Sequence, residues 1–152
     1  MKSPQFRQYA AADHAACMAL FESNCPEFFA PYERRDYTEY LADSPKDYVV
    51  CQAGEKIIGA YGTCFNHDDE RGHLSWILID PNAQGSGVGT QMVERVLTYF
   101  QSENVDVIEI AASQKSAPFF ARFGAVEVSR TVEGWGPGLD RVEMELSCDR
   151  SV

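Results

Sequence analysis

Residues 84–90 (QGSGVGT) have the composition of a site for a phosphate-bearing ligand. Gly85, Gly87 and Gly89 lack Cβ atoms, so the backbone N–H groups beside them can approach an anion closely. A helix is predicted to begin at Val88, and the N-terminus of a helix offers N–H groups that have no partner within the helix. The segment therefore predicts a cradle for a pyrophosphate group.

The spacing of these glycines argues against two common nucleotide-binding loops. The nucleoside triphosphate loop places a lysine directly after its last glycine, whereas no lysine follows Gly89. The dinucleotide fingerprint G-x-G-x-x-G, started at Gly85, needs a third glycine where this chain has Thr90. The pattern that remains is Gln84-x-x-Gly87-x-Gly89.

The elements that must position this segment are a strand before it and a helix after it. Residues 74–79 form an apolar run that predicts a buried strand. Pro81 ends the run, because proline cannot donate a hydrogen bond to a neighbouring strand. The helix is predicted from apolar residues at helical spacing: Val88, Met92, Val96 and Tyr99.

These features together resemble the GNAT superfamily of acyl-coenzyme A-dependent N-acyltransferases. The family's signature is Gln or Arg, two residues, Gly, one residue, then Gly or Ala, between a bulged strand and a helix. A second strand at 105–112 and the segment 117–125 follow in the family's order. The resemblance implies acetyl-coenzyme A as co-substrate and no metal, and it assigns the following residues to cofactor binding: Ile77, Leu78, Ile79, Gln84, Gly85, Ser86, Gly87, Val88, Gly89, Thr90 and Ser113.

Within this set the resemblance implies different contacts. Residues 85–90 would bind the pyrophosphate, and the main chain of residues 77–79 would pair with the pantetheine arm. A β-bulge in that strand would direct one N–H at the thioester carbonyl and stabilise the oxyanion. Ser113 matches a position where the family often places a polar side chain against pantetheine, although a helix cap is an equal alternative.

The chain departs from the family at Phe120. The family commonly has a tyrosine at this position, seven residues after that of Ser113, and its hydroxyl protonates the departing thiolate. A phenyl ring donates no proton, but a thiol with a pKa of about 8.5 can leave as the thiolate near neutral pH. Phe119, Phe120 and Phe123 are also spaced as a helix face that packs into the core.

Two residues are candidates for the base that deprotonates the amine, which is needed because an alkylamine with a pKa near 10 is protonated at neutral pH. His73 begins the central strand, close to where some GNAT enzymes carry a catalytic glutamate. Glu109 lies in the next strand, four residues before Ser113, so its side chain is expected on the same face of that strand as Ser113 and could face the cleft. Alternatively both side chains are simply solvated, and a water chain serves as the base.

Aromatic side chains on two loops are candidates for binding the amine substrate: Phe28, Phe29, Tyr32 and Trp135. Together with acidic residues they suit a cationic or amphipathic amine. Alternatively they close the hydrophobic core beneath the loops. Polyamines, aminoglycosides, amino acids and protein N-termini all remain open as substrates.

Composition indicates one globular domain over residues 1–152, with 45% hydrophobic and 24% charged residues. The net charge of −10 argues against nucleic-acid binding. Five cysteines without a C-x-x-C pair predict reduced thiols and a cytoplasmic protein. No signal peptide or membrane-spanning run is predicted, and hence no membrane partner.

The expected fold class is mixed α/β, with a mostly antiparallel sheet of about six or seven strands flanked by helices. The resemblance adds a parallel pair of strands that splay apart to admit the cofactor. The expected strands are 6–10, 48–52, 57–65, 74–79, 105–112, 126–131 and 141–146, and the expected helices are 13–22, 34–42, 117–123 and one from residue 88.

Three functions follow from these features. The leading one is an N-acetyltransferase that moves the acetyl group of acetyl-coenzyme A to a primary amine of a small molecule or peptide, by direct attack in a ternary complex. The second is a noncatalytic acyl-coenzyme A sensor or regulatory domain, which Phe120 would suit. The third is a nucleotide-binding module of another kind. The acyl-chain preference and a homodimer are left open.

Overall fold

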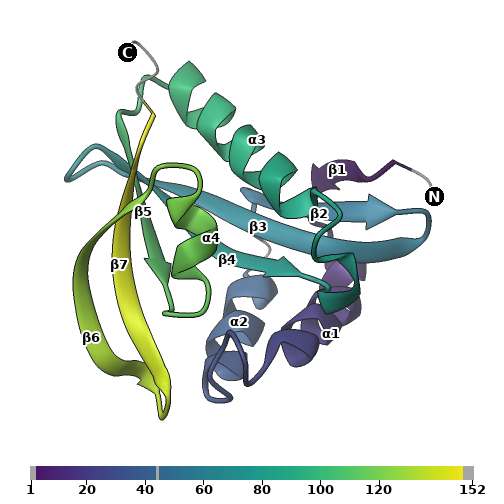
Figure 1. The fold of residues 1–152 in the computed structure, drawn as a ribbon. Helices are drawn as coiled ribbons and strands as arrows, with labels where there is room; N and C mark the ends of the chain where they lie inside the picture. Colours follow the sequence, from purple (N-terminus) through teal and green to yellow (C-terminus); the bar gives the residue numbers. More distant parts are fainter. Residues whose placement is uncertain (1–2, 44, 149–152) are drawn as a thin grey trace. The chain divides into compact units, whose positions relative to one another are not determined.

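The computed structural model describes residues 3–43 and 45–148. Its strands and helices follow in the order drawn in Figure 1: β1 (Gln5–Gln8), α1 (His14–Asn24), α2 (Glu33–Ala42), β2 (Tyr48–Ala53), β3 (Lys56–Asn66), β4 (Arg71–Ile79), α3 (Val88–Ser102), β5 (Val107–Ala112), α4 (Ala117–Ala121), β6 (Val126–Gly136) and β7 (Leu139–Ser147). Short 3₁₀ turns lie at Ala11–Asp13 and Pro81–Ala83. No helix in the described ranges is both long and apolar enough to span a membrane.

The strands hydrogen-bond in the order β1-β2-β3-β4-β5-β7-β6. Neighbours β4 and β5 run parallel, and their register extends from Gly72 opposite Ile108 to Leu74 opposite Ile110. The pairs β1–β2, β2–β3, β5–β7 and β6–β7 are antiparallel. The expected mixed α/β class with a mostly antiparallel sheet and one parallel pair is therefore confirmed.

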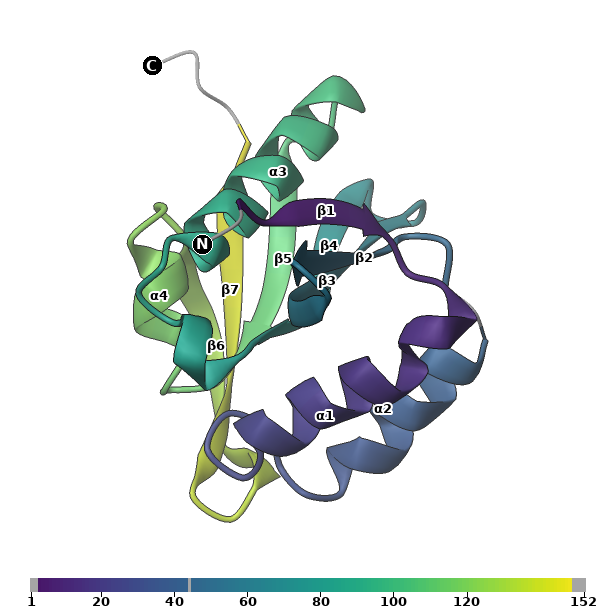
Figure 2. The ribbon, with the colours of Figure 1, turned by 90° about the vertical axis from the view of Figure 1, so that its right-hand side faces the viewer.

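The chain divides into two compact units, and the first comprises residues up to Gly62 together with Trp76–Thr90. In this unit α1 and α2 lie side by side (Figure 2). Their buried residues recur at helical spacing, as Cys17 and Phe21 do in α1 and Tyr37 and Leu41 in α2. These side chains share one hydrophobic core with Tyr48 and other residues of the strands.

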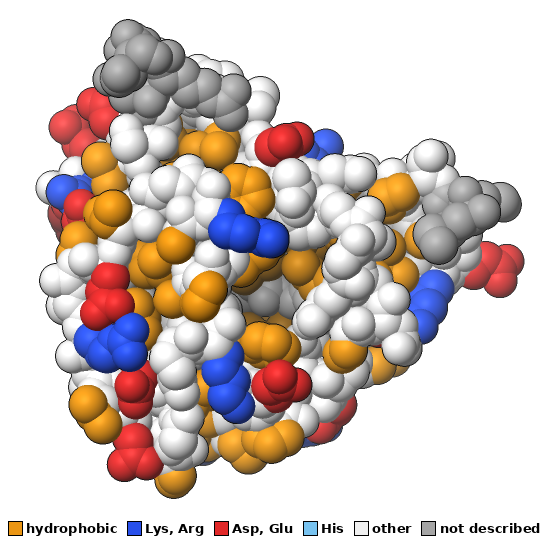
Figure 3. Space-filling model, viewed as in Figure 1, with side chains coloured by type: hydrophobic (Ala, Val, Ile, Leu, Met, Phe, Trp, Pro, Cys, Tyr) orange, Lys and Arg blue, Asp and Glu red, His pale blue; other side chains and the backbone are white. Residues whose placement is uncertain are grey.

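The second unit comprises Thr63–Ser75 and Gln91–Val152. Its strand β5 buries alternate residues, including Ile108 and Ile110, as a strand with one covered face does. Gly72 of β4 allows close packing with α3, because a Cβ at this position would lie 2.7 Å from the ring of Phe100. Outside the core, charged side chains of both signs surround single hydrophobic groups on the β6 side of the unit (Figure 3).

Most predicted elements are confirmed, with differences at their ends. The last hairpin is longer than predicted, because pairing continues to Gly136 opposite Leu139 and leaves only a tight turn. The short helix predicted at 117–123 ends at Ala121. There the N–H of Ala125 bonds the carbonyl of Phe120, and Gly124 has a φ of +99°, a helix ending that glycine favours.

Candidate functional site

The predicted cradle connects the 3₁₀ turn to α3 and has an unusual backbone. Gly85 and Gly87 have φ values of +84° and +92°, a region that L side chains rarely adopt. A Cβ at either position would meet no protein atom within 4 Å, so the space beside the backbone is open. The first four N–H groups of α3 have no acceptor within the helix. The strand–turn–helix arrangement is as predicted, and binding of a cofactor by it stays a prediction.

Asp80 holds the turn that precedes the cradle. Its carboxylate accepts a hydrogen bond from the N–H of Asn82 at 2.9 Å and lies 2.9 Å from the ammonium of Lys56. Its own N–H donates to the carbonyl of Ile58 at 2.8 Å. Burial by itself would raise the pKa of this carboxyl, but the Asn82 N–H and the Lys56 ammonium outweigh burial and hold the pKa below its ordinary value.

We expect Asp80→Ala to lower the free energy of unfolding by about 1 kcal/mol at pH 7, the usual cost of losing a capping side chain. The pKa of Asp80 is lower in the folded protein than in the unfolded chain. The ionised Asp80 carboxylate therefore stabilises the fold fully at pH values above its unfolded-state pKa. This stabilisation is lost as the pH falls through the folded-state pKa of Asp80. Urea denaturation at pH 7 and at about pH 3 should therefore give a smaller deficit at the lower pH.

The matched control is Asp80→Asn, which keeps an oxygen acceptor for the Asn82 N–H but lacks the charge. Its deficit at pH 7 isolates the contribution of the carboxylate charge. A deficit for Asp80→Ala that is equal at both pH values would contradict the role given to ionised Asp80.

Strand β4 is distorted at Trp76, whose φ is +47°. A bulky residue in the left-handed region is an outlier, and within a strand such a residue is a mark of β-bulges. The carbonyl of Trp76 accepts a hydrogen bond from the hydroxyl of Tyr48 at 2.8 Å. The irregularity expected in this strand is thus present, immediately before the residues 77–79 assigned to the pantetheine arm.

Ser113 caps the turn that leads into α4. Its buried Oγ accepts hydrogen bonds from the N–H groups of Lys115 and Ser116, each at 3.2 Å. The N-cap of α4 is Ser116, so Ser113 closes the preceding turn and is not itself the helix cap, and its contact with pantetheine stays a prediction. Phe120 is also buried, so the core interpretation holds for this ring, whereas Phe119 and Phe123 are only partly buried.

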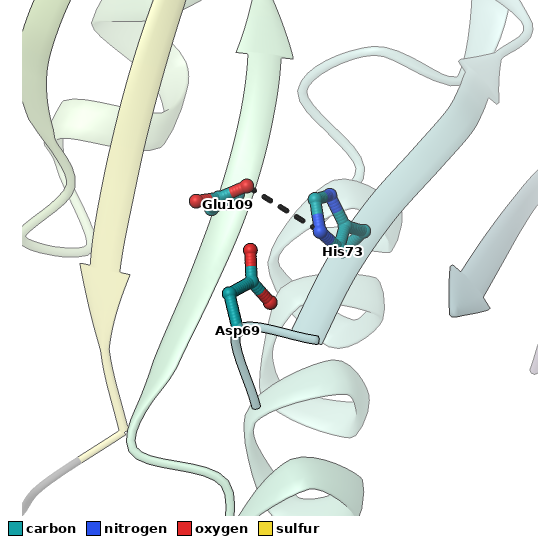
Figure 4. A group of neighbouring side chains, drawn as sticks. All are labelled: Asp69, His73 and Glu109. Carbon is teal, nitrogen blue, oxygen red and sulfur yellow. Dashed lines mark ion pairs between the residues drawn. The ribbon is translucent and has the colours of Figure 1, made fainter. Parts of the chain in front are cut away.

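His73 and Glu109 are brought together by the register of the parallel strands, in which they lie opposite each other. Nε2 of His73 is 3.3 Å from Oε2 of Glu109, and about a third of each side chain is exposed (Figure 4). Arg71 lies 3.2 Å from the other Glu109 oxygen and 2.6 Å from Glu145. The two residues predicted as alternative bases therefore form one pair, and Arg71, which the sequence pattern did not indicate, contacts Glu109.

Asp69 lies beside this pair (Figure 4), and the three residues could each offer a ligand atom to a metal ion, with these atoms within 4.8 Å of one another. Arg71 opposes such a role. Its guanidinium bonds Glu109, and its main-chain N–H donates to the Asp69 carboxylate at 3.0 Å, so part of the negative charge is already offset. Proton transfer by His73 and Glu109 stays a prediction.

The aromatic residues proposed for substrate binding have different surroundings. Phe29 stacks on Trp76 with ring centroids 6.1 Å apart and packs on Phe21 in the core of the first unit, and Phe28 is partly buried. The indole N–H of Trp135 donates to the carbonyl of Ala112 at 2.9 Å.

Tyr32 is the most exposed of the four, at 57%. It borders an open hollow of about 610 Å³ whose lining includes Arg34, Arg35 and Glu39, and the two arginines are paired with Glu22 and Glu39. Phe29 packs against the hydrophobic core, whereas Trp135 contacts the Ala112 carbonyl and lies beneath the guanidinium of Arg141. Substrate binding by all four residues stays a prediction.

Comparison with known proteins gives consistent results. A sequence model of the acetyltransferase (GNAT) family matches residues 17–125. An uncharacterized N-acetyltransferase of Methanocaldococcus jannaschii is 26% identical over 110 residues, which are 66% of this chain and 48% of that protein. The chain thus spans about half the length of this relative.

Solved structures with similar folds cover nearly the whole chain. A protein of Desulfovibrio desulfuricans assigned to the GNAT acetyltransferases superposes with a TM-score of 0.81 at 19% identity, over 97% of this chain and 100% of that one. An aminoglycoside 6′-N-acetyltransferase complexed with coenzyme A superposes with a TM-score of 0.76 at 10% identity, over 97% of this chain and 99% of that one. At these identities the likeness establishes the fold.

Proposed function

Because the chain belongs to the acetyltransferase (GNAT) family, we propose that it is an N-acetyltransferase that moves an acetyl group from acetyl-coenzyme A to a primary amine of a small molecule or peptide. The observation that carries this proposal is the open cradle at Gly85 and Gly87, which leads into α3 and follows the distorted strand β4. The aminoglycoside 6′-N-acetyltransferase that shares this fold is complexed with coenzyme A, and this supports the choice of cofactor.

Each part of the cofactor would meet a different part of the chain. The pyrophosphate would accept hydrogen bonds from the N–H groups of residues 85–90, because these lie at a helix N-terminus and two of the glycines leave the approach open. The pantetheine arm would pair with the main chain of residues 77–79 of β4. The amine would attack the thioester carbonyl directly, and a β4 N–H would stabilise the oxyanion that develops.

The pair of His73 and Glu109 supports a proton-transfer role better than either residue does alone. A carboxylate beside an imidazole fixes its orientation and stabilises the imidazolium that forms when it accepts a proton from the amine. Arg71 in turn holds Glu109 in place from its other oxygen. We assign His73 as the base and Glu109 as its partner.

The leaving group needs no acid from Phe120. Coenzyme A would depart as a thiolate or take a proton from water, because a thiol with a pKa of about 8.5 is a moderately good leaving group near neutral pH. The net charge of −10 suits an amine substrate. Polyamines, aminoglycosides, amino acids and peptide N-termini are all amines that the proposal accommodates.

The proposal is tested by measuring thiol release from acetyl-coenzyme A with a panel of these amines. We expect the native protein to acetylate at least one class, and Phe120→Tyr to change turnover by less than about tenfold, since an added acid matters only where proton donation limits the rate. Phe120 is buried, so a thermal melt must accompany this variant to establish that the added hydroxyl is accommodated.

Two outcomes would contradict the proposal. A native protein that binds acetyl-coenzyme A but acetylates no amine, while Phe120→Tyr becomes active, would place the chain among noncatalytic sensors. A native protein that fails to bind acetyl-coenzyme A in calorimetry would remove the cofactor assignment itself.

A further inference from the structure

Trp76 adopts a backbone conformation that the surrounding structure must hold in place. Its φ of +47° is unfavourable for a large L side chain. Such conformations persist only where neighbouring groups determine them strongly, and they are concentrated at functional sites. The contacts that hold Trp76 therefore indicate what the distortion of β4 is for.

The first of these contacts is a chain of two tyrosine hydroxyls. The hydroxyl of Tyr48 donates to the Trp76 carbonyl at 2.8 Å, and the hydroxyls of Tyr37 and Tyr48 are also 2.8 Å apart. Since Tyr48 has a single hydroxyl hydrogen and gives it to Trp76, Tyr37 must be the donor to Tyr48. Both tyrosines are fully buried, and burial raises the pKa of Tyr48, so its hydroxyl remains a donor over the physiological pH range.

The second contact is an aromatic cage around the indole ring. The ring of Trp76 lies 5.0 Å from Tyr37, 6.2 Å from Tyr40 and 6.1 Å from Phe29, measured between centroids. Aromatic pairs at these separations stabilise one another beyond the burial of their surface. The cage fixes the side chain of Trp76, while Tyr48 fixes its carbonyl.

The carbonyl of Trp76 belongs to the same planar peptide unit as the N–H of Ile77. In a trans peptide these two groups point in opposite directions, so a hydrogen bond that fixes one also fixes the other. The hydroxyl of Tyr48 thus sets the direction of the Ile77 N–H, which lies at the start of the segment assigned to the cofactor.

We propose that Tyr48 is a positioning residue for acetyl transfer, whose hydroxyl holds the Trp76–Ile77 peptide so that the Ile77 N–H donates to the thioester oxygen. The inference rests on the proposed function, and it identifies which main-chain donor serves as the oxyanion site and which side chain orients it. Tyr48 itself touches neither substrate nor cofactor in this arrangement.

The test compares three tyrosine-to-phenylalanine variants. Tyr48→Phe should lower kcat by about 10- to 100-fold, less than the complete loss of an oxyanion donor, with the Kd of acetyl-coenzyme A within about threefold of the native value. Tyr37→Phe should have a smaller effect, because the bond from Tyr48 to Trp76 survives. Tyr9→Phe is the control, because the ring of Tyr9 packs on Tyr48 within the same core, while its hydroxyl is not one of the two that lead to the Trp76 carbonyl. Equal kcat values for Tyr48→Phe and Tyr9→Phe would overturn the proposal.

A second comparison separates the backbone from the indole. Trp76→Asn and Trp76→Val both remove the ring, but asparagine tolerates the left-handed region whereas β-branched valine does not. The proposal expects Trp76→Asn to retain at least about tenfold more kcat than Trp76→Val, because valine disfavours the required peptide orientation. Equal losses in the two variants would overturn it.

A crystal structure of Tyr48→Phe supplies a readout that needs no substrate. We expect the Trp76 carbonyl and the Ile77 N–H to turn away from their native directions, and a Trp76–Ile77 peptide that keeps its native orientation would overturn the proposal. If this change occurs but the native protein acetylates no amine, the proposed function fails while the orienting contact of Tyr48 is supported. The two failures are therefore distinguishable.

Discussion

Gly87→Val should weaken the binding of acetyl-coenzyme A by about 100-fold or abolish it. Valine is unfavourable at a φ of +92°, and a strain of about 1–3 kcal/mol corresponds to a factor of about 5 to 150 in affinity if it is relieved by moving the cradle. The new side chain would also project into the open space that the pyrophosphate is proposed to occupy. Isothermal titration calorimetry with acetyl-coenzyme A measures this effect.

Gly54→Val provides a matched control for backbone strain. Gly54 lies in the turn between β2 and β3 and has a φ of +64°, and a Cβ added there would likewise meet no atom within 4 Å. This variant should lose stability but keep native affinity, because it strains the backbone outside the cradle. Ser86→Ala should also bind normally, since the Ser86 hydroxyl bonds the carbonyl of Ala83. A folded Gly87→Val with native affinity would rule out the cradle assignment.

Removing the proposed base should have the largest effect on turnover. His73→Ala and Glu109→Gln are each expected to lower kcat by about 10²- to 10⁴-fold with acetyl-coenzyme A binding intact, the range typical of a general base. Because the two side chains lie 3.3 Å apart, they should act as a unit. The double variant should then be no slower than the slower single variant, since effects within a catalytic unit are not additive.

Glu145→Gln is the control for this pair. Glu145 and Glu109 both contact the same guanidinium nitrogen of Arg71, so this variant disturbs that guanidinium while leaving the contact between His73 and Glu109 in place. It should retain kcat within about threefold, in the range of surface ion-pair effects. Near-native activity of both His73→Ala and Glu109→Gln across the pH range would require a water-relayed route in place of this pair.

The cradle and its flanking elements could be predicted because their determinants are local. The glycines, the proline after β4 and the helical periodicity after Val88 lie within one short segment, and each acts through the geometry of its own backbone. The family resemblance depended on the same segment. The departure at Phe120 was visible for the same reason, because a residue type at a fixed spacing needs no tertiary contact to be recognised.

The extent of the last hairpin was less predictable. The expected strands 126–131 and 141–146 left a long loop between them, whereas Gly136 pairs with Leu139 in the structure after an irregular stretch that follows Thr131. Glycines mark where a turn can form, but the number of paired residues depends on the partner strand. For Phe29, the loop position predicts a substrate contact, which stays untested, and only the structure shows that its ring packs on Phe21.

By itself, then, the sequence determined the cradle, the order of the elements, the fold class and the family. Only the tertiary structure decided that His73 and Glu109 face each other, because strand register depends on the packing of whole strands and a shift of one residue would reverse every side chain. It likewise decided that the hydroxyl of Tyr48 meets the carbonyl of Trp76. These residues are distant in the sequence, and no local propensity encodes a contact that exists only when the core around both has formed.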